Sequence, residues 1–340
     1  MREIGSEFWL EREPKMLSQD RDGCYVLAGR TAIDLILQDI VKTRPVRNAY
    51  LPAWCCDSMF APFLAHRIYV DFYDVRFHRQ LGCHTDYTDC TDIFYVTNYF
   101  GYENTLNIDI VRQFKAKGFI ILYDRTHSFL MDNDPYVALA DYSFASIRKW
   151  MGVIGGAVVE GVKSKALNPY PYLAPKEKAM RIKQAYMSGD ESVDKQEFLR
   201  LYGEFGHHLA EDYCDYAMDD LSYALYKAVD LSVVKAKRRE NAKYLHEHLK
   251  LQFLAPLTDD ACPLFVPVLF DTKEERDRVR KKLIEAEIYC PVHWPKPALI
   301  PADFEVNKIY DIELSLICDQ SYGLDDMARM VEVIYHTESK

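Results

Sequence analysis

The feature that most constrains the fold is a regular alternation of short apolar runs with amphipathic segments across the first half of the chain. Apolar residues recur at helical spacing over 31–42, which predicts a helix buried on one face. Apolar runs follow at 68–75, 93–99 and 119–123, with a helical pattern over 108–114 before the last of them. Short apolar strands that alternate with helices are typical of βαβ units around a buried parallel sheet. The sequence therefore predicts an α/β fold.

The second half predicts a helical connection and then a smaller unit. Residues 164–230 are polar, aromatic and helical in pattern. Three helices are expected after them: one over 233–249, one that begins after the capping pair Thr272 and Glu275, and one that begins at about Leu324. Three strands are also expected, over 264–270, near Tyr289 and near Leu314.

The length of 340 residues fits two domains, because single hydrophobic cores stop growing at about 250 residues. We expect a large three-layer α/β/α domain with a mainly parallel sheet over residues 1–235, including the N-terminal segment and the helical connection. A smaller α+β domain is expected over 236–340.

Composition restricts the classes of function. The chain is 49% hydrophobic and 28% charged, as in ordinary globular proteins, and its net charge is −10. An acidic chain of this kind lacks the basic surface that nucleic-acid binding requires. No apolar run reaches the ~18 residues of a membrane span, and residues 1–15 lack the apolar core of a secretion signal. We expect a cytoplasmic protein that binds neither nucleic acid nor membrane.

The nine cysteines are odd in number and widely spread, so reduced thiols are expected. Cys83, His84 and Cys90, with Cys55 and Cys56 upstream, are conceivable metal ligands. They lack the paired short spacings of structural zinc sites, and no metal is predicted.

Asp124 follows an apolar strand directly, within the segment 123–127. Acids at the carboxyl end of a parallel strand lie at the edge where open α/β sheets bind ligands. A helix N-cap is an equally simple interpretation of an aspartate at this position. The functional alternative is a carboxylate that keeps a pyridine nitrogen protonated, as pyridoxal 5'-phosphate (PLP) requires for its electron sink.

Lys149 follows two serines, Ser143 and Ser146, that could donate to a phosphate, and it precedes a pair of glycines. By itself it would be read as a solvated loop lysine. The neighbouring Arg148 and Trp150 would exclude water and lower the pKa of its amine, as a lysine that attaches PLP requires.

Two further stretches complete the pattern. The residues at 29–32 open the first long helix, and a helix N-terminus that begins with glycine can bind a phosphate, although many helices begin this way for capping reasons. Trp54, in a turn that begins at Pro52, is a candidate for stacking on a flat cofactor ring, although an aromatic residue near a turn is more often core.

These four stretches, in this order, resemble the DegT/StrS (DegT/DnrJ/EryC1/StrS) family of PLP-dependent sugar aminotransferases, which has the fold-type I architecture of aspartate aminotransferase. The resemblance spans nearly the whole chain. It also includes the segments 96–101, 238–241, 290–295 and 314–322.

The resemblance implies a role for each matching residue. Lys149 corresponds to the lysine that attaches PLP, Asp124 to the partner of the pyridine nitrogen, and His127 to a side chain beside the ring hydroxyl. The cofactor-binding residues it implies are Gly29, Arg30, Thr31, Ala32, Trp54, Asp124, His127, Ser143 and Lys149. Thr31, Ala32 and Ser143 fall where the family holds the phosphate, and Cys55 or Cys56 is an alternative to Trp54.

Two departures from the family pattern affect these assignments. The family has one residue fewer between the Ser-Phe pair at 143–144 and the lysine, so Ser143 is displaced relative to Lys149. The Asn-x-Arg motif that sugar-nucleotide members present from a neighbouring subunit is not evident around 218–222. The second departure loosens the substrate assignment and leaves the cofactor assignment in place.

The resemblance implies an aminotransferase that moves an amino group from an amino acid such as glutamate to a keto sugar, nucleotide-linked, for surface polysaccharide or a related glycan. It also implies a homodimer whose active sites are shared between subunits. The alternatives are a PLP enzyme acting on another amine or as a dehydratase, and a non-catalytic protein that keeps the fold. Arg30, Arg148 and His293 could bind an anionic substrate or pair with carboxylates, and the sequence leaves their roles open.

Overall fold

The computed structural model describes residues 2–11, 21–78, 81–85, 92–103, 107–163 and 165–336. The helices are α1 (Gly29–Thr43), α2 (Asp57–Ala65), α3 (Ile108–Ala116), α4 (Leu173–Met187), α5 (Lys195–Glu211), α6 (Asp220–Ala228), α7 (Leu231–His248), α8 (Lys273–Glu285), α9 (Val306–Ile312) and α10 (Leu324–Tyr335). The strands are β1 (Ile4–Gly5), β2 (Cys24–Val26), β3 (Asn48–Pro52), β4 (Tyr69–Phe77), β5 (Leu81–His84), β6 (Ile93–Thr97), β7 (Ile120–Asp124), β8 (Tyr142–Ala145), β9 (Ala157–Glu160), β10 (Gln252–Phe253), β11 (Val266–Leu269), β12 (Ile288–Tyr289) and β13 (Glu313–Leu316).

The large part of the fold is built on an eight-stranded sheet with the order β2-β9-β8-β7-β6-β3-β4-β5. Its central pairs, β4 with β3, β3 with β6, β6 with β7 and β7 with β8, are parallel. The alternation in the sequence is thus confirmed as an α/β fold with a mainly parallel sheet. The outer pairs β2 with β9, β9 with β8 and β4 with β5 are antiparallel. Apolar runs in the sequence predict strands but do not indicate the direction of the strands near the two edges of the sheet.

The parallel register determines where the chemistry-bearing residues gather. Thr97 at the end of β6 lies opposite Asp124 at the end of β7, and Asp124 lies opposite Phe144 of β8. All three therefore stand at the carboxyl edge of the sheet. Helix α1, which packs against β8 and β9, begins beside the same edge, because a methyl group added at Gly29 would lie 3.4 Å from the Phe144 ring.

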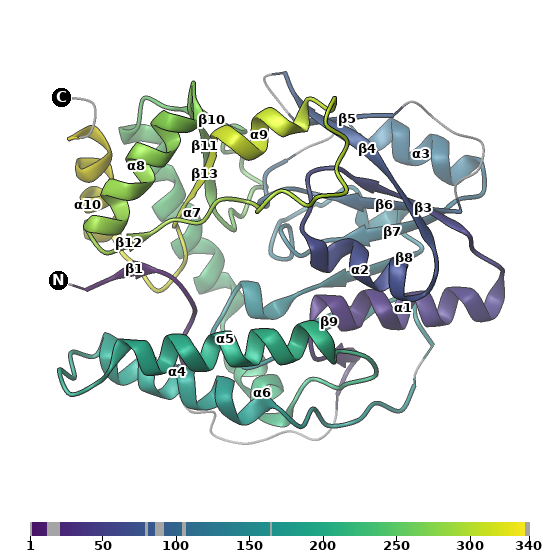
Figure 1. Ribbon diagram of the computed structural model, residues 1–340, viewed down its shortest axis with the longest axis horizontal. Helices are drawn as coiled ribbons and strands as arrows, with labels where there is room; N and C mark the ends of the chain where they lie inside the picture. Colours follow the sequence, from purple (N-terminus) through teal and green to yellow (C-terminus); the bar gives the residue numbers. More distant parts are fainter. Residues whose placement is uncertain are drawn as a thin grey trace.

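The C-terminal part forms a separate lobe, on the left of Figure 1, around the antiparallel sheet β10-β11-β13 and helices α7, α8 and α10. Its elements match the helices and strands expected from the sequence. The N-terminal strand β1 pairs in parallel with β12 of this lobe, and Ile4 and Trp9 belong to its hydrophobic core. The N-terminal segment, which was expected within the large domain of residues 1–235, thus packs on the C-terminal lobe.

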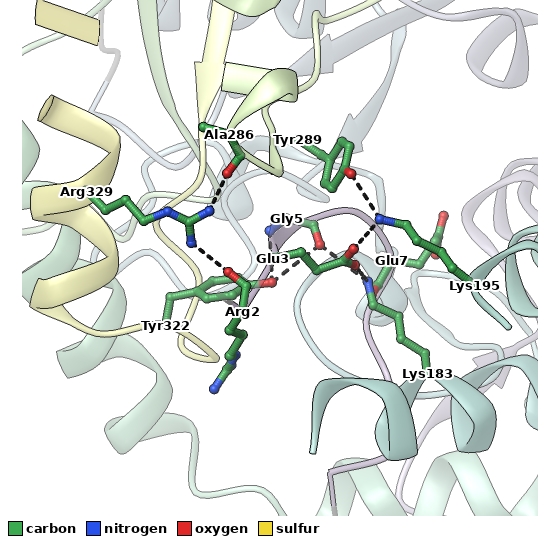
Figure 2. Close-up of polar contacts among 10 residues, drawn as sticks. All are labelled: Arg2, Glu3, Gly5, Glu7, Lys183, Lys195, Ala286, Tyr289, Tyr322 and Arg329. Atoms are coloured by element: carbon green, nitrogen blue, oxygen red, sulfur yellow. Dashed lines mark hydrogen bonds and ion pairs between the residues drawn. The ribbon is translucent and has the colours of Figure 1, made fainter. Parts of the chain in front are cut away.

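A buried ion-pair cluster fixes this N-terminal segment (Figure 2). Glu3 is 2% exposed, and its carboxylate lies 3.2 Å from Lys183 Nζ of α4 and 2.5 Å from Lys195 Nζ of α5. Lys195 Nζ also donates to the Tyr289 hydroxyl of β12, and Lys183 Nζ donates to the Glu7 carbonyl. A single buried carboxylate thus joins the helical pair α4–α5 to the C-terminal lobe.

The segment expected to be a helical connection consists of α4, α5 and α6, with α4 packed against α5 along one side of the molecule (Figure 1). Across the described residues, no helix combines the length and apolar character needed to span a membrane.

Candidate active site

A cavity of about 360 Å³ opens at the carboxyl edge of the large sheet, between that sheet, α5 and the C-terminal lobe. Its walls come from segments that are far apart in the sequence, between Ala28 and Trp294. The lining residues include Gly29, Arg30, Cys56, Thr97, Asp124, Thr126, His127, Phe144, Ser146, Arg148, Lys149, Gly206, Leu209, Phe265, His293 and Trp294. The structure therefore brings together Gly29, Arg30, Asp124, His127 and Lys149, which were predicted from positions up to 120 residues apart in the sequence.

Asp124 lies at the floor of the cavity and is 7% exposed. Its carboxylate accepts hydrogen bonds from the Thr126 backbone N–H at 2.8 Å and from the Tyr95 hydroxyl at 2.7 Å. Burial raises the pKa of Asp124, and these two donors and the Lys149 amine oppose that rise. A cation placed in the cavity against Asp124 would stabilise the carboxylate anion further.

His127 is held as a neutral ring. The Phe100 backbone N–H donates to its Nδ1 at 3.2 Å, so the ring hydrogen must lie on Nε2. Burial lowers the pKa of His127 to about 3, with a smaller contribution from Lys149. Gly101 makes the tight turn behind this contact: its φ is +76°, and a Cβ there would lie 2.1 Å from the Cys262 carbonyl oxygen. His127 can therefore donate a hydrogen bond from Nε2.

Lys149 ends the short turn η2 (Ile147–Lys149), and the next residue anchors that turn. Trp150 is completely buried, and its Nε1 donates to the Thr126 carbonyl at 2.6 Å. The Trp150 carbonyl accepts from Gln320 Nε2 at 2.8 Å and from the Arg238 guanidinium at 3.3 Å. Arg238 also lies 4.7 Å from the centre of the Trp150 ring. The backbone of the lysine turn is thus pinned to both lobes.

The Lys149 side chain is exposed where it lines the cavity. The protein around its amine and the adjacent Arg148 guanidinium lower the pKa of Lys149, and Glu7 and Asp124 raise it less strongly. A lowered pKa increases the fraction of neutral amine, which is the nucleophilic and basic form. The lysine expected from the sequence therefore lies in an environment that favours reactivity.

Replacing Arg238 with methionine is expected to lower the free energy of unfolding by about 3 kcal/mol. The change leaves the buried Leu264 carbonyl without its donor and the Trp150 carbonyl with Gln320 alone. Urea denaturation followed by tryptophan fluorescence measures this change. The matched control is Arg200→Met, whose side chain is 64% exposed, with an expected change below about 0.5 kcal/mol. Equal losses in the two variants would contradict the anchoring role of Arg238.

The N-terminus of α1 offers free donors to the cavity. The Ala32 N–H already donates to the Ala28 carbonyl at 2.9 Å, whereas helix geometry leaves the N–H groups of Gly29, Arg30 and Thr31 without partners inside the helix. Thr31 does not line the cavity; it is fully buried, and its Oγ1 has no hydrogen-bond partner. An orphaned hydroxyl beside free N–H groups is a site for an anion. Ala32, which was predicted with this group, has no free N–H to contribute.

Two positive side chains lie near this anion site. Arg30 donates to the Leu209 carbonyl of α5 at 3.0 Å, and Arg148 lines the cavity beside Lys149. The Nε atoms of both arginines are buried without a hydrogen-bond partner. Because buried guanidinium groups normally satisfy their donors, these two atoms indicate that an acceptor belongs in the cavity.

Two other predicted residues are placed away from the cavity. Trp54 is completely buried, stacks on Tyr99 with ring centres 4.6 Å apart, and does not line the cavity. Cys56, the alternative to Trp54 in the sequence, does line it. The Ser143 hydroxyl donates to Glu160 at 2.5 Å, whereas Ser146 lines the cavity. Successive residues of a strand point to opposite faces, so Phe144 faces the cavity and Ser143 does not.

Tyr95 and Thr126, which hold Asp124, were not predicted from the sequence. The signal for Tyr95 was its position two residues before Thr97, on the same face of a strand that ends at the site. Within the described part of the chain, no group of three or more His, Cys, Asp or Glu residues could hold a metal ion, and none of the cysteines there forms a disulfide. Cys90, considered above as a ligand, lies outside the described residues.

Comparisons with protein-family models and with curated proteins found no match. Solved structures do match. PseC from Helicobacter pylori, an aminotransferase involved in the biosynthesis of pseudoaminic acid, has a TM-score of 0.72 at 15% identity, covering 100% of both chains. NtdA from Bacillus subtilis, solved with the cofactor PMP, has a TM-score of 0.66 at 17% identity, covering 93% of this chain and 73% of NtdA. The sugar aminotransferase CalS13 from Micromonospora echinospora has a TM-score of 0.63 at 14% identity, covering 92% and 86%.

These likenesses extend over nearly the whole chain and agree with the sheet order and the two lobes described above. The chain therefore has the fold of the fold-type I PLP-dependent aminotransferases. The fold class expected from the sequence is confirmed.

Proposed function

We propose that this protein is a PLP-dependent aminotransferase in which Lys149 attaches the cofactor. The observation that carries the proposal is that one cavity contains the Lys149 amine, the buried Asp124 carboxylate and the anion site at the start of α1. Those three groups match the aldehyde, the pyridine nitrogen and the phosphate of PLP. The fold and the resemblance of the sequence to the DegT/StrS family support the same assignment.

The residues around the cavity fit this cofactor. The free N–H groups of α1 and the unpartnered Thr31 hydroxyl would hold the phosphate, with Ser146, Arg30 and Arg148 in reach of the same region. His127 Nε2–H would donate to the ring hydroxyl, because its other nitrogen is occupied by the Phe100 N–H.

When bound, PLP supplies an electron sink that lowers the cost of removing the proton beside a substrate amine. Asp124 keeps that sink effective, because its carboxylate favours a protonated ring nitrogen. Lys149 Nζ takes the proton from the substrate carbon and returns it elsewhere, and its lowered pKa suits that task. Tyr95 and Thr126 hold the Asp124 oxygens in place.

For the substrates, we propose an amino acid donor such as glutamate and a keto sugar acceptor, nucleotide-linked, for a surface polysaccharide or related glycan. PseC and CalS13, which share the fold, support a sugar acceptor. We also propose that the protein acts in the cytoplasm as a homodimer whose partner subunit completes each site, as in the family that the sequence resembles.

A second candidate function has a specific observation in its favour. Arg148 reaches the same cavity as Lys149, with a buried Nε that lacks a partner, and the sequence carries one extra residue between its Ser-Phe pair and the lysine. A guanidinium cannot attach PLP covalently. If Arg148 rather than Lys149 faces the cofactor aldehyde, the protein is a non-catalytic module that keeps the fold.

The absorption spectrum of the purified protein separates the two candidates. With added PLP, the aminotransferase shows a visible band that L-glutamate bleaches, and borohydride reduction followed by peptide mass mapping locates the cofactor on Lys149. A protein that shows no visible band with PLP contradicts the proposal. The double variant Arg148→Lys with Lys149→Ala then supplies a direct check: a band that appears only in this variant would show that position 148 faces the aldehyde.

Replacing Ser146 with alanine is expected to weaken PLP binding by about 10-fold, because it removes one hydroxyl donor from the phosphate region. Fluorescence titration of the protein with PLP measures the dissociation constant. Ser143→Ala is the matched control: its hydroxyl contacts Glu160, so PLP affinity should stay the same. A larger loss for Ser143 than for Ser146 would restore the original assignment of the phosphate contact.

A further inference from the structure

A hydrogen-bonded chain leads from the core of the C-terminal lobe to the cavity. Glu313 is 1% exposed, and its Oε1 lies 2.5 Å from the Ser315 hydroxyl. The same hydroxyl lies 2.8 Å from Nδ1 of His293, which lines the cavity. The second carboxylate oxygen of Glu313 accepts the His293 backbone N–H at 2.7 Å.

The two side-chain hydrogen bonds, Glu313 to Ser315 and Ser315 to His293, each require one hydrogen atom. If Glu313 is ionised, Ser315 donates to Glu313, so His293 must carry its hydrogen on Nδ1. If Glu313 is protonated, it donates to Ser315, which then donates to a bare Nδ1, and the ring hydrogen lies on Nε2. The protonation of Glu313 therefore determines which nitrogen of a neutral His293 is a donor.

The surroundings favour the protonated form of Glu313 at neutral pH. Burial raises its pKa to about 8. The groups that face it from the packed elements are the Arg276 guanidinium of α8, which donates to the Glu313 backbone carbonyl at 2.9 Å, the Cys290 thiol and His293 itself. Arg276 lowers the Glu313 pKa, but less than burial raises it.

His293 is itself neutral and firmly held. Burial, with smaller effects from His127 and Lys149, keeps its pKa well below the ordinary value. The indole N–H of Trp54 donates to the His293 carbonyl at 2.5 Å, and the Phe100 and Phe265 rings lie 5.2 and 4.9 Å from its ring. Its Nε2 has no hydrogen-bond partner among the described residues, so this nitrogen is available to a ligand in the cavity.

We propose that His293 donates a hydrogen bond from Nε2 to a carbonyl or carboxylate oxygen of the substrate, and that Glu313, acting through Ser315, is the positioning residue that keeps the hydrogen on that nitrogen. The substrate contact rests on the proposed function, whereas the control of the ring hydrogen does not. Removal of the Glu313 proton at high pH would move the His293 hydrogen to Nδ1 and convert Nε2 from a donor to an acceptor.

The first test uses the protein without added cofactor, so it does not depend on aminotransferase activity. In protein labelled with ¹⁵N-histidine, and with His293 assigned by comparison with His293→Phe, the ring nitrogen shifts report the tautomer. We expect hydrogen on Nε2 at pH 7 and a change toward Nδ1 as the pH rises through about 8 to 9. In Glu313→Gln, the amide donates to Ser315 at every pH, so hydrogen should stay on Nε2. A tautomer that behaves identically in both proteins would overturn the proposal.

The second test uses PLP-loaded protein with L-glutamate and 2-oxoglutarate as probes. His293→Phe should raise the half-saturating concentration of at least one probe by about 3- to 10-fold, the value of one hydrogen bond. In the wild type, the half-saturating concentration should rise by the same factor between pH 7 and 9, whereas in Glu313→Gln it should not change over this range. Unchanged affinity for both probes in His293→Phe would overturn the substrate contact, whereas a protein that does not load PLP would overturn the proposed function instead.

Discussion

Lys149→Ala is expected to lack the visible absorption band of the PLP-bound protein and to transfer amino groups at least about 10³-fold more slowly than the wild type. The lysine would have two tasks, attaching the cofactor and moving the substrate proton, and alanine performs neither. Spectra with added PLP and a glutamate half-reaction followed by stopped flow measure the two effects separately.

Arg148→Met is the matched control for Lys149→Ala, because it alters the adjacent residue of the same turn and removes a positive charge from the same cavity. It should retain the band. Since Arg148 lowers the pKa of Lys149, the pKa of the lysine should rise in this variant. The pH at which the absorption band changes should therefore be higher than in the wild type. Retained turnover in Lys149→Ala would exclude the proposed role.

Asp124→Asn is expected to bind PLP but to react on the order of 10²- to 10³-fold more slowly with glutamate. The variant should fold normally, because asparagine can still accept the Thr126 N–H and can donate to the Tyr95 hydroxyl in place of accepting from it. What it loses is the anion that favours a protonated ring nitrogen. Single-turnover kinetics with saturating glutamate measures the change.

Tyr95→Phe provides the comparison for Asp124→Asn. It removes one donor to Asp124 and keeps the charge, so its effect should be about 10-fold or less. An Asp124→Asn rate equal to that of the wild type would show that Asp124 serves only as a structural acceptor for Thr126 and Tyr95, as in the N-cap interpretation of the sequence.

Much of the site could be predicted from the sequence, because the positions of Asp124, His127 and Gly29 follow from the local sequence pattern. Asp124 directly follows an apolar strand, and parallel strands bring their carboxyl ends to one edge. His127 follows within the same turn, and Gly29 begins a helix whose periodicity is clear. These residues required only the type of each element and its end.

Residues whose side chains had to be assigned to one face were predicted less well. Ser143 and Phe144 are neighbours, yet only Phe144 reaches the cavity, and Cys56 replaces Trp54 two residues away. A shift of one residue in a strand reverses the face of the side chain, and a turn has no period at all. The sequence pattern could not resolve such shifts.

The sequence alone determined the α/β alternation, the lysine segment and the acid at the strand end, because these follow from periodicity and from neighbours along the chain. Only the tertiary structure decided that β1 pairs with β12, that Arg238 and Gln320 hold the lysine turn, and that Glu313, Ser315 and His293 are joined by hydrogen bonds. Apart from the Glu313–Ser315 bond within β13, these contacts join residues 22 to 284 positions apart. Their strength depends on burial and on side-chain direction, which arise only when the two lobes and the N-terminal segment pack together.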